Sequence, residues 1–264
     1  MSFSKYLAQI NDPYERKARL WPGLLVVAPI VIALVDRYGA KHPVLAAAAS
    51  VLGASGGMYG LASIVRGRGK ACEDRLVSKW GGMPTTIALR HRDEFLDSNT
   101  KQRYHELISR KLGLSMPTVE DEKKNPVSAD DVYIGATKRL RELTRNDKGL
   151  LFKENIAYGF HRNMLGMKPI GIAICLFAVL QGLLQANLLQ PNSPQIVIAN
   201  LRDVTVSTGI TFAVAFIFLA AWTLYFMPSA VRRIGFVYAE RLFERLPSLK
   251  VAGSSRSSNE TRTE

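Results

Sequence analysis

The sequence predicts an all-α membrane protein with four transmembrane helices in two hairpins and a cytosolic helical domain inserted between them. Two observations support this fold class. The apolar residues, which make up 47% of the 264-residue chain, are gathered into four blocks with the charged residues between them. A soluble core would instead alternate apolar and polar residues at the period of a helix or a strand. The 35 Lys and Arg residues are also spread unevenly around the blocks, which predicts an orientation in the membrane.

The four apolar blocks predict helices that cross a bilayer. They lie at about 20–35, 44–65, 169–189 and 206–227. The first block is short against the roughly 20 residues that a span requires, and Pro29 in its middle is expected to kink it. Trp21 and Trp222 are expected at the membrane interfaces, where amphipathic rings are enriched. Because no block holds a charged residue in its interior, a proton relay or an ion path is not expected.

Small and polar side chains within two of the blocks predict how the helices pack. The second block carries a ridge of small residues that includes Gly53, Gly57 and Gly60. Such ridges let helix backbones approach closely, either within one chain or across a homo-oligomer, and both interpretations stay open. In the third block, Gln181 and Gln185 are expected to hydrogen-bond to neighbouring helices or to line a wet path.

The distribution of Lys and Arg predicts that both termini and the central domain are cytosolic. Only Arg37, Lys41 and Arg202 lie in the two short loops that connect the spans of each hairpin. The other basic residues lie on the opposite side, and such an excess marks cytosolic segments. The expected segments are a cytosolic N-terminus 1–19, a hairpin 20–65, a basic helical domain 66–167, a hairpin 168–227, an amphipathic surface helix 228–250 and a disordered tail 251–264.

Turn and capping residues divide the cytosolic domain into helices. Gly81 and Gly82 are expected to end a helix that continues the second span. Thr85 or Thr86 is expected to cap the next helix, and Ser128 a later one. The predicted helices cover 66–80, 87–96, 99–112, 128–143 and 150–167, with a connector at 115–127. The last of these helices should run directly into the third span.

The stretch around the Gly-Gly pair is the first candidate binding site. Two glycines before a helix start expose backbone N–H groups, and a helix N-terminus favours an anion. Nearby hydroxyls and arginines would strengthen the binding. The residues concerned are Gly81, Gly82, Thr85, Thr86, Arg90, His91 and Arg92. They do not form a Walker loop, because no Lys follows the glycines at the required place. A plain Gly-Gly turn with a threonine cap is the alternative.

Two further groups of basic residues are candidates for binding the same anion. Lys138, Arg141 and Arg145 lie three and four residues apart, on a different helix face from the apolar stripe. His161 and Arg162 precede the third span, where they either anchor to lipid headgroups or turn into the domain toward the arginines at 90 and 92. Excess positive charge beside a membrane also binds anionic lipid, at about 1 kcal/mol per residue.

The sequence contains no recognisable catalytic, metal or cofactor motif. His91, His105 and His161 fall in the domain, but none has the spacing of a zinc site. No Ser or Cys sits in a nucleophile turn. Cys72 lies in a charged stretch and Cys175 in an apolar block, so no disulfide is expected. No catalytic residue, metal or cofactor is therefore assigned.

Two strings in this chain resemble a group of uncharacterised bacterial inner-membrane proteins. The first is WGGMPTT followed by LRHRD, and the second is LLFKENIAYGFHRNMLGMKPIG. The resemblance spans roughly residues 70–172 and implies a bacterial inner-membrane location. It implies no activity and transfers no catalytic residue.

Together these features predict a non-enzymatic membrane protein. Its cytosolic domain would bind an anionic ligand or partner and pass the signal to the four-helix region, as a sensor or a channel-like effector. The expected partners are anionic lipids, a nucleotide, a nucleic acid or a cytosolic protein, and a further copy of the chain. Two alternatives remain: a scaffold that recruits a cytosolic protein, and a membrane-bound enzyme acting on lipid or nucleotide phosphate. The enzyme would need His91, His105 or His161 to converge with Asp93 or Glu154 in one pocket.

Overall fold

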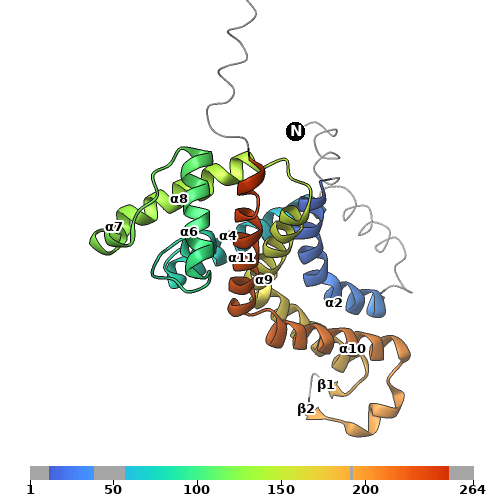
Figure 1. Cartoon of the computed structure of the whole chain (residues 1–264). Helices are drawn as coiled ribbons and strands as arrows, with labels where there is room; N and C mark the ends of the chain where they lie inside the picture. Colours follow the sequence, from blue (N-terminus) through green and yellow to red (C-terminus); the bar gives the residue numbers. More distant parts are fainter. Residues whose placement is uncertain (1–11, 39–56, 191–192, 250–264) are drawn as a thin grey trace, which may run out of the picture. The chain divides into compact units, whose positions relative to one another are not determined.

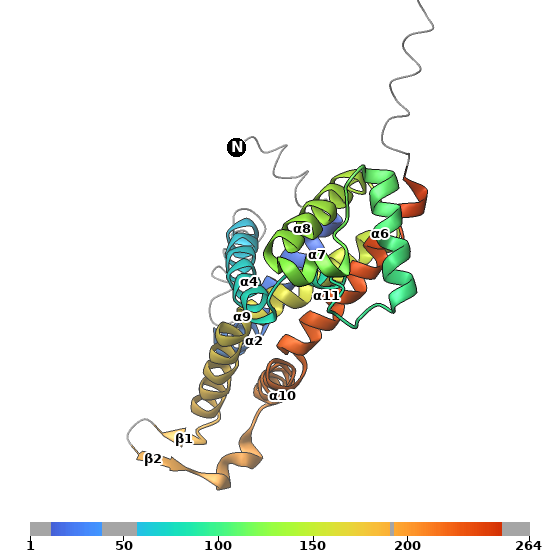
Figure 2. The same cartoon turned by 60° about the vertical axis from the view of Figure 1, so that its left-hand side comes forward.

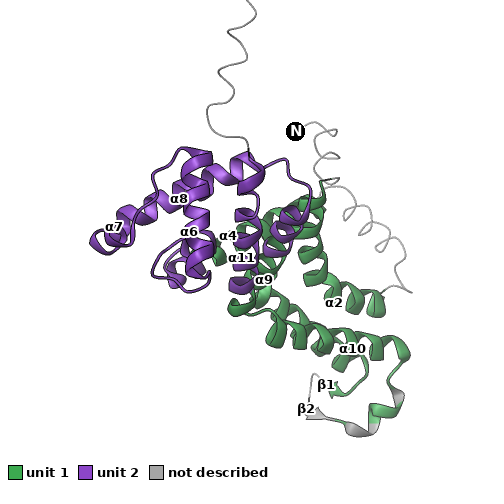
Figure 3. Ribbon diagram, viewed as in Figure 1, with its two compact units in different colours: residues 1–75, 159–230 green, residues 76–158, 231–264 purple. Residues whose placement is uncertain are grey.

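The computed structural model describes residues 12–38, 57–190 and 193–249, which form two compact units (Figure 3). Unit 1 takes the described residues of Met1–Arg75 and Gly159–Ala230, and unit 2 those of Leu76–Tyr158 and Val231–Glu264. Most of the predicted 66–167 domain therefore falls in unit 2, together with a C-terminal helix that the sequence analysis placed apart from it. The predicted disordered tail at 251–264 lies outside the described residues.

Unit 1 consists mainly of long helices (Figures 1 and 2). Its elements are η1 (Glu15–Leu20), α2 (Trp21–Tyr38), α4 (Met58–Trp80), α9 (Leu150–Gln185), β1 (Leu189–Gln190), β2 (Ser193–Ile196), η3 (Ile198–Asp203), α10 (Val206–Ala220) and η4 (Ala221–Tyr225). Helices α4 and α9 also contribute residues to unit 2. The short antiparallel hairpin of β1 and β2 lies where we expected only a connecting loop.

Three helical segments are long and apolar enough to cross a membrane. They are Glu15–Tyr38, Leu150–Gln185 and Val206–Tyr225. They confirm a largely helical chain suited to a membrane, and they match the first, third and fourth predicted blocks. The first helix is longer than its apolar block, because η1 continues it into the charged segment, where Arg19 pairs with Glu15 one turn away. The second predicted block lies mostly at 39–56, outside the described residues, so a fourth span stays a prediction.

Apolar side chains point outward from these helices in unit 1. A soluble protein buries such residues, whereas a membrane-spanning helix exposes them to lipid. The exposed ones include Val31, Leu34, Val35, Leu176, Phe177, Leu180, Ile210, Phe216, Ile217 and Leu224. Their exposure follows from the uniform apolarity of the blocks, which leaves no polar face for water.

Small residues set the helix packing within unit 1. A Cβ atom added at Gly166 of α9 would lie 2.7 Å from the carbonyl oxygen of Arg68 and 2.8 Å from Cα of Gly69, both in α4. Gly171 likewise leaves room for the indole of Trp222, which is fully buried. The prediction that Trp222 anchors at an interface is therefore wrong, because the glycine opposite creates an internal pocket for its ring.

The predicted small-residue ridge is only partly described. Gly53 lies outside the described residues, whereas Gly57 lies just before α4 and Gly60 in its first turn, and both are exposed. No described atom lies within 4 Å of a Cβ built at Gly60. Within the described part of the chain, Gly60 therefore contacts no neighbouring helix, and a homo-oligomer through Gly53, Gly57 and Gly60 stays a prediction.

Unit 2 is a bundle of shorter helices (Figure 1). Besides the ends of α4 and α9, its elements are α5 (Pro84–Ile87), α6 (Ser98–Leu112), α7 (Val119–Lys124), α8 (Pro126–Leu143), α11 (Pro228–Phe243) and η5 (Leu246–Ser248). The first three residues of α11 belong to unit 1. Helix α6 agrees with the predicted helix at 99–112, and Tyr104, Leu107 and Ile108 on its apolar face are buried as expected.

Three predicted boundaries in unit 2 are wrong for local reasons. The helix expected at 87–96 is only the four-residue α5, because the chain from Ala88 onward turns back. The connector expected at 115–127 contains α7, since Thr118 and Asp121 form a reciprocal capping box. Helix α8 begins at Pro126 rather than after Ser128, because the side chain of Asn125 caps it.

Helix α11 belongs to the core of unit 2. Its buried residues include Phe236, Leu242 and Phe243, and they join one apolar cluster with α6, α8 and η5. The ring of Phe243 lies 5.5 Å from that of Tyr104 in α6. We predicted a helix lying on the membrane surface at 228–250, but its most apolar face is covered by helices of the same chain. The sequence pattern alone does not distinguish these two environments, because each requires one apolar face.

Candidate functional site

The Gly-Gly pair ends α4 and gives Arg90 access to the backbone. Gly81 has φ +74°, a left-handed conformation that favours glycine, and the N–H of Gly82 donates to the carbonyl of Val77. The Arg90 guanidinium donates to the carbonyl of Gly81 at 2.6 Å. A Cβ at Gly82 would lie 2.8 Å from Nη2 of Arg90, so a larger residue would displace the guanidinium.

Carboxylates of the chain itself contact the predicted anion-binding arginines. Arg90 donates from Nε and Nη2 to the two oxygens of Asp130 in α8, at 2.8 and 2.7 Å. Arg92 donates from Nη1 to Glu122 at 2.8 Å and lies 3.3 Å from Asp130. Thr85 and Thr86 are buried in α5. The structure thus brings the Gly-Gly turn and both arginines together, around internal anions.

Glu122 of α7 holds the loop that carries His91 and Arg92. Its carboxylate, 3% exposed, accepts from the backbone N–H of His91 at 2.7 Å and of Arg92 at 3.2 Å, and from the Tyr133 hydroxyl at 2.7 Å. Burial alone would raise the pKa of Glu122. The hydrogen bonds from Tyr133, His91 and Arg92, with the Arg92 charge, outweigh burial and lower that pKa. Burial and the same hydrogen bond raise the pKa of Tyr133.

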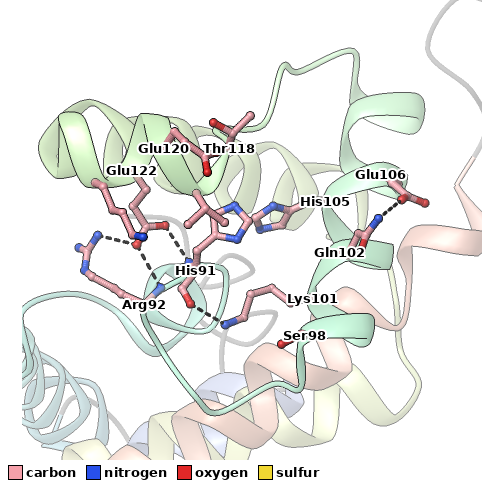
Figure 4. Close-up of a pocket in the computed structure, with 12 residues that line it drawn as sticks. His91, Arg92, Ser98, Lys101, Gln102, His105, Glu106, Thr118, Glu120 and Glu122 are labelled. Carbon is pink, nitrogen blue, oxygen red and sulfur yellow. Dashed lines mark hydrogen bonds and ion pairs between the residues drawn. The ribbon is translucent and has the colours of Figure 1, made fainter.

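A cavity of about 640 Å³ opens between α6, α7 and the 88–97 loop (Figure 4). This volume suits a small-molecule ligand. Most of its lining residues are of polar or charged types, with both signs of charge, and they come from three elements. The residues that line it are His91, Arg92, Ser98, Lys101, Gln102, His105, Glu106, Thr118, Val119, Glu120, Glu122 and Lys123. Figure 4 shows His91 and His105 side by side, with Glu122 and Arg92 at one end and Gln102 and Glu106 at the other.

Two histidines and a lysine form the inner wall of the cavity. The rings of His91 and His105 meet edge to face with their centroids 4.7 Å apart. Nε2 of His91 lies 2.9 Å from the carbonyl of Pro117, and Nε2 of His105 lies 2.8 Å from that of Leu89. In the neutral rings, Nε2–H donates to these carbonyls, which leaves Nδ1 as the acceptor. The buried Lys101 donates to the carbonyl of Asp93.

Burial lowers the pKa of His105, and electrostatic interaction with His91 and Lys101 lowers it further, against the opposing effects of the Leu89 hydrogen bond and of Glu122. The folded state therefore binds this proton more weakly than the unfolded state does. Above the unfolded-state pKa of about 6.5, His105 does not reduce the free energy of unfolding. Below that pH the unfolded chain takes up a proton that the folded chain does not, so unfolding becomes more favourable.

We expect the free energy of unfolding of unit 2 to fall between pH 7 and pH 5, by at most about 1.4 kcal/mol per pH unit from His105. The substitution His105→Gln should reduce this slope in thermal unfolding of the full chain in neutral detergent. The control Gln102→Ala, at a residue that lines the same cavity but does not titrate, should leave the slope unchanged. An equal slope in wild type and His105→Gln would show that His105 is not the group responsible.

The remaining predicted site residues lie elsewhere. Arg162 of α9 contacts the buried Glu73 of α4 at 3.3 Å, and Nε2 of His161 lies 3.4 Å from the hydroxyl of Tyr225, all within unit 1. Lys138, Arg141 and Arg145 are exposed at and just after the C-terminal half of α8. Arg90 and Arg92 therefore share one carboxylate partner, Asp130, whereas Arg162 pairs with Glu73.

Two residues that organise the cavity, Glu122 and Lys101, are not among the predicted site residues. Glu122 stood in a charged run taken as a connector, and Lys101 was not considered. The Thr118–Asp121 capping box was the available signal, because it predicts a helix that begins at residue 119. The enzyme alternative required Asp93 or Glu154 beside the histidines. The carboxylates that line the cavity are instead Glu106, Glu120 and Glu122.

No family model, curated protein or solved structure matches this chain. The geometry of the cavity and the apolar helices are therefore the basis for a functional proposal.

Proposed function

We propose that this chain is a membrane-anchored binding protein of a bacterial inner membrane, and that the cavity of unit 2 binds a small anionic ligand. Four spans, including one over about 44–65, hold it in the bilayer with both termini and unit 2 in the cytosol. Binding in unit 2 is sensed by the membrane region. The observation that carries the proposal is the cavity of about 640 Å³ in a unit rich in basic residues.

The membrane part of the proposal is supported by the three long apolar helices and by the distribution of basic residues. Segments rich in Lys and Arg stay cytosolic. Helices α4 and α9 supply the physical route for a signal, because each contains residues of both units. A ligand that favours one arrangement of unit 2 would shift the population of arrangements of these helices.

The ligand part is supported by the chemistry of the cavity wall. Arg92, Lys101 and Lys123 supply positive charge, and Ser98 and Gln102 supply neutral hydrogen-bonding groups. Arg92 and Lys101 already hold partners in the chain, whereas the exposed Lys123 has no hydrogen bond or ion pair among the described residues. Lys123 is therefore the cation best placed to meet an incoming phosphate or carboxylate. The acidic residues in the wall favour a ligand that also carries hydrogen-bond donors.

The test is calorimetric titration of the full chain, in neutral detergent, with ATP and separately with inorganic phosphate. We expect saturable binding of at least one of them. The substitution Lys123→Glu should weaken it by about tenfold or more, since a charge-assisted hydrogen bond is lost and a repulsive charge is gained.

The neighbouring substitution Lys124→Glu is the matched control, because Lys124 is exposed on the same helix but does not line the cavity. It changes net charge equally and should leave binding nearly unaltered. Equal losses in the two variants would mean that only long-range charge matters. That result, or the absence of any heat of binding with both ATP and inorganic phosphate, would refute the proposed ligand site.

A further inference from the structure

The outward face of α8 is a second feature that the cavity does not explain. Val127 is 73% exposed and Ile134 is 48% exposed, although both are large apolar residues. They lie seven positions apart, so both project from the same face, on the far side of the helix from the buried Ala129 and Ala136. No described atom lies within 4 Å of a Cβ built at Gly135, so the backbone beside Ile134 is open to a close approach.

The charges on this face are separated along the helix. Asp131 lies toward the N-terminal end, and Lys138 and Arg141 lie toward the C-terminal end, at spacings that keep all three beside Ile134. All three are exposed, and no hydrogen bond or ion pair engages their side chains among the described residues. We define the outer face of α8 as Val127, Asp131, Ile134, Lys138 and Arg141.

We propose that the outer face of α8 docks against the same face of a second copy of this chain, with the two helices antiparallel. A two-fold axis beside Ile134 and Gly135 places Asp131 of each copy opposite Lys138 of the other, so the same ion pair forms twice. The apolar contact of Ile134 lies at the centre of the pair. A parallel arrangement would instead set Lys138 against Lys138 and Asp131 against Asp131.

Charge complementarity favours this occupant over an anionic lipid surface. A lipid-binding face gains from uniform positive charge, whereas this one carries Asp131 within a turn of Ile134. A self-complementary face, acidic at one end and basic at the other, satisfies itself only when the partner runs in the opposite direction. The proposal is independent of the ligand site, because it uses no residue that lines the cavity.

The geometry is tested first by cysteine cross-linking of the full chain in neutral detergent and in nanodiscs. Residues near a two-fold axis approach their own copies, so Ile134→Cys should yield a covalent dimer with a short bis-maleimide. Arg139→Cys is the matched control, since it lies on the same helix but about 140° around from Ile134. The native Cys72 and Cys175 are both buried and should not react.

The ion pair is tested by reversing charges. Asp131→Lys alone and Lys138→Asp alone should each raise the dimer dissociation constant by about tenfold, since each replaces two attractive contacts by repulsive ones. The double variant D131K/K138D restores opposite charges and should return the dissociation constant toward that of wild type. Analytical ultracentrifugation in detergent measures the dissociation constants of wild type, the two single variants and the double variant.

The outcomes are distinct. Dimer formation at Ile134→Cys together with rescue by the double variant supports the proposal. Cross-linking at Ile134→Cys no stronger than at Arg139→Cys, or no rescue, overturns it. Protection of the Ile134→Cys thiol only in nanodiscs that contain phosphatidylglycerol, without a dimer, assigns the face to lipid and also overturns it.

Discussion

Replacing Glu122 with alanine is expected to destabilise unit 2 by about 3–5 kcal/mol. The carboxylate accepts four hydrogen bonds, from the N–H groups of His91 and Arg92, the Arg92 guanidinium and the Tyr133 hydroxyl. Without it, the buried Tyr133 hydroxyl and the loop N–H groups lose their acceptor. Leaving buried donors unpaired costs far more than a typical hydrogen bond contributes.

The isosteric change Glu122→Gln separates charge from shape. Glutamine keeps one acceptor oxygen, so it should cost about half as much as alanine. The pKa of Glu122 is lowered in the fold, so its stabilising effect is present above its unfolded pKa of about 4.3 and is lost as the pH falls through the folded value. Neither Glu122→Ala nor Glu122→Gln should show this loss of stability at acid pH, because neither carries the carboxylate.

Hydrogen exchange and thermal unfolding of the full chain in detergent measure the effect. The amides of His91 and Arg92 should exchange much faster in Glu122→Ala, because their acceptor is gone. Glu120→Ala is the control, since Glu120 lies on the same helix but is exposed and should cost less than about 0.5 kcal/mol. Unchanged exchange at residues 88–93 in Glu122→Ala would show that the carboxylate does not hold this loop.

Adding one methyl group at Gly166 is expected to disrupt the packing of unit 1. The new Cβ would meet the carbonyl oxygen and carbon of Arg68 and Cα of Gly69, which are backbone atoms and cannot rotate away. Helices α4 and α9 must then separate, at a cost of about 1–3 kcal/mol or more.

The matched substitution is Gly67→Ala in α4. No described atom lies within 4 Å of a Cβ built there, and alanine is the better helix former by about 1 kcal/mol, so Gly67→Ala should be neutral or stabilising. The temperature at which each purified variant aggregates in detergent compares the two. Equal values for Gly166→Ala and wild type would mean that the α4–α9 contact is looser than the structure indicates.

Helices could be predicted from the sequence where a single glycine or capping residue sets the end of the helix. The Gly-Gly pair stops α4 at Trp80, and Asp97 and Gly113 cap α6 close to the predicted ends. The prediction failed between residues 87 and 127, where α5 is short and α7 was missed. There the backbone follows hydrogen bonds from Arg90 and to Glu122, whose partners lie 9 to 40 residues away in the chain. No local pattern reports contacts at that distance, although the Thr118–Asp121 capping box does mark the start of α7.

Hydrogen bonds near the ends of the apolar helices were also only partly foreseen. Gln181 was expected to bond to a neighbouring helix or to line a wet path, and it accepts from Arg37 of α2 at 3.1 Å. Asp36 was placed in a loop, yet it belongs to α2 and accepts from the hydroxyl of Thr208 in α10 at 3.0 Å. Helix α2 extends to Tyr38 because its polar end finds partners on neighbouring helices, and the apolar block alone does not reveal them.

The sequence by itself determined that this chain is largely helical and carries apolar helices that suit a membrane, because both properties depend on composition and on the spacing of residues within one segment. Only the tertiary structure decided what its charged residues contact. Arg90 and Arg92 look like free cations in the sequence, but they meet Asp130 and Glu122 from distant helices. An ion pair depends on distances in space, and those are set by packing of the whole unit.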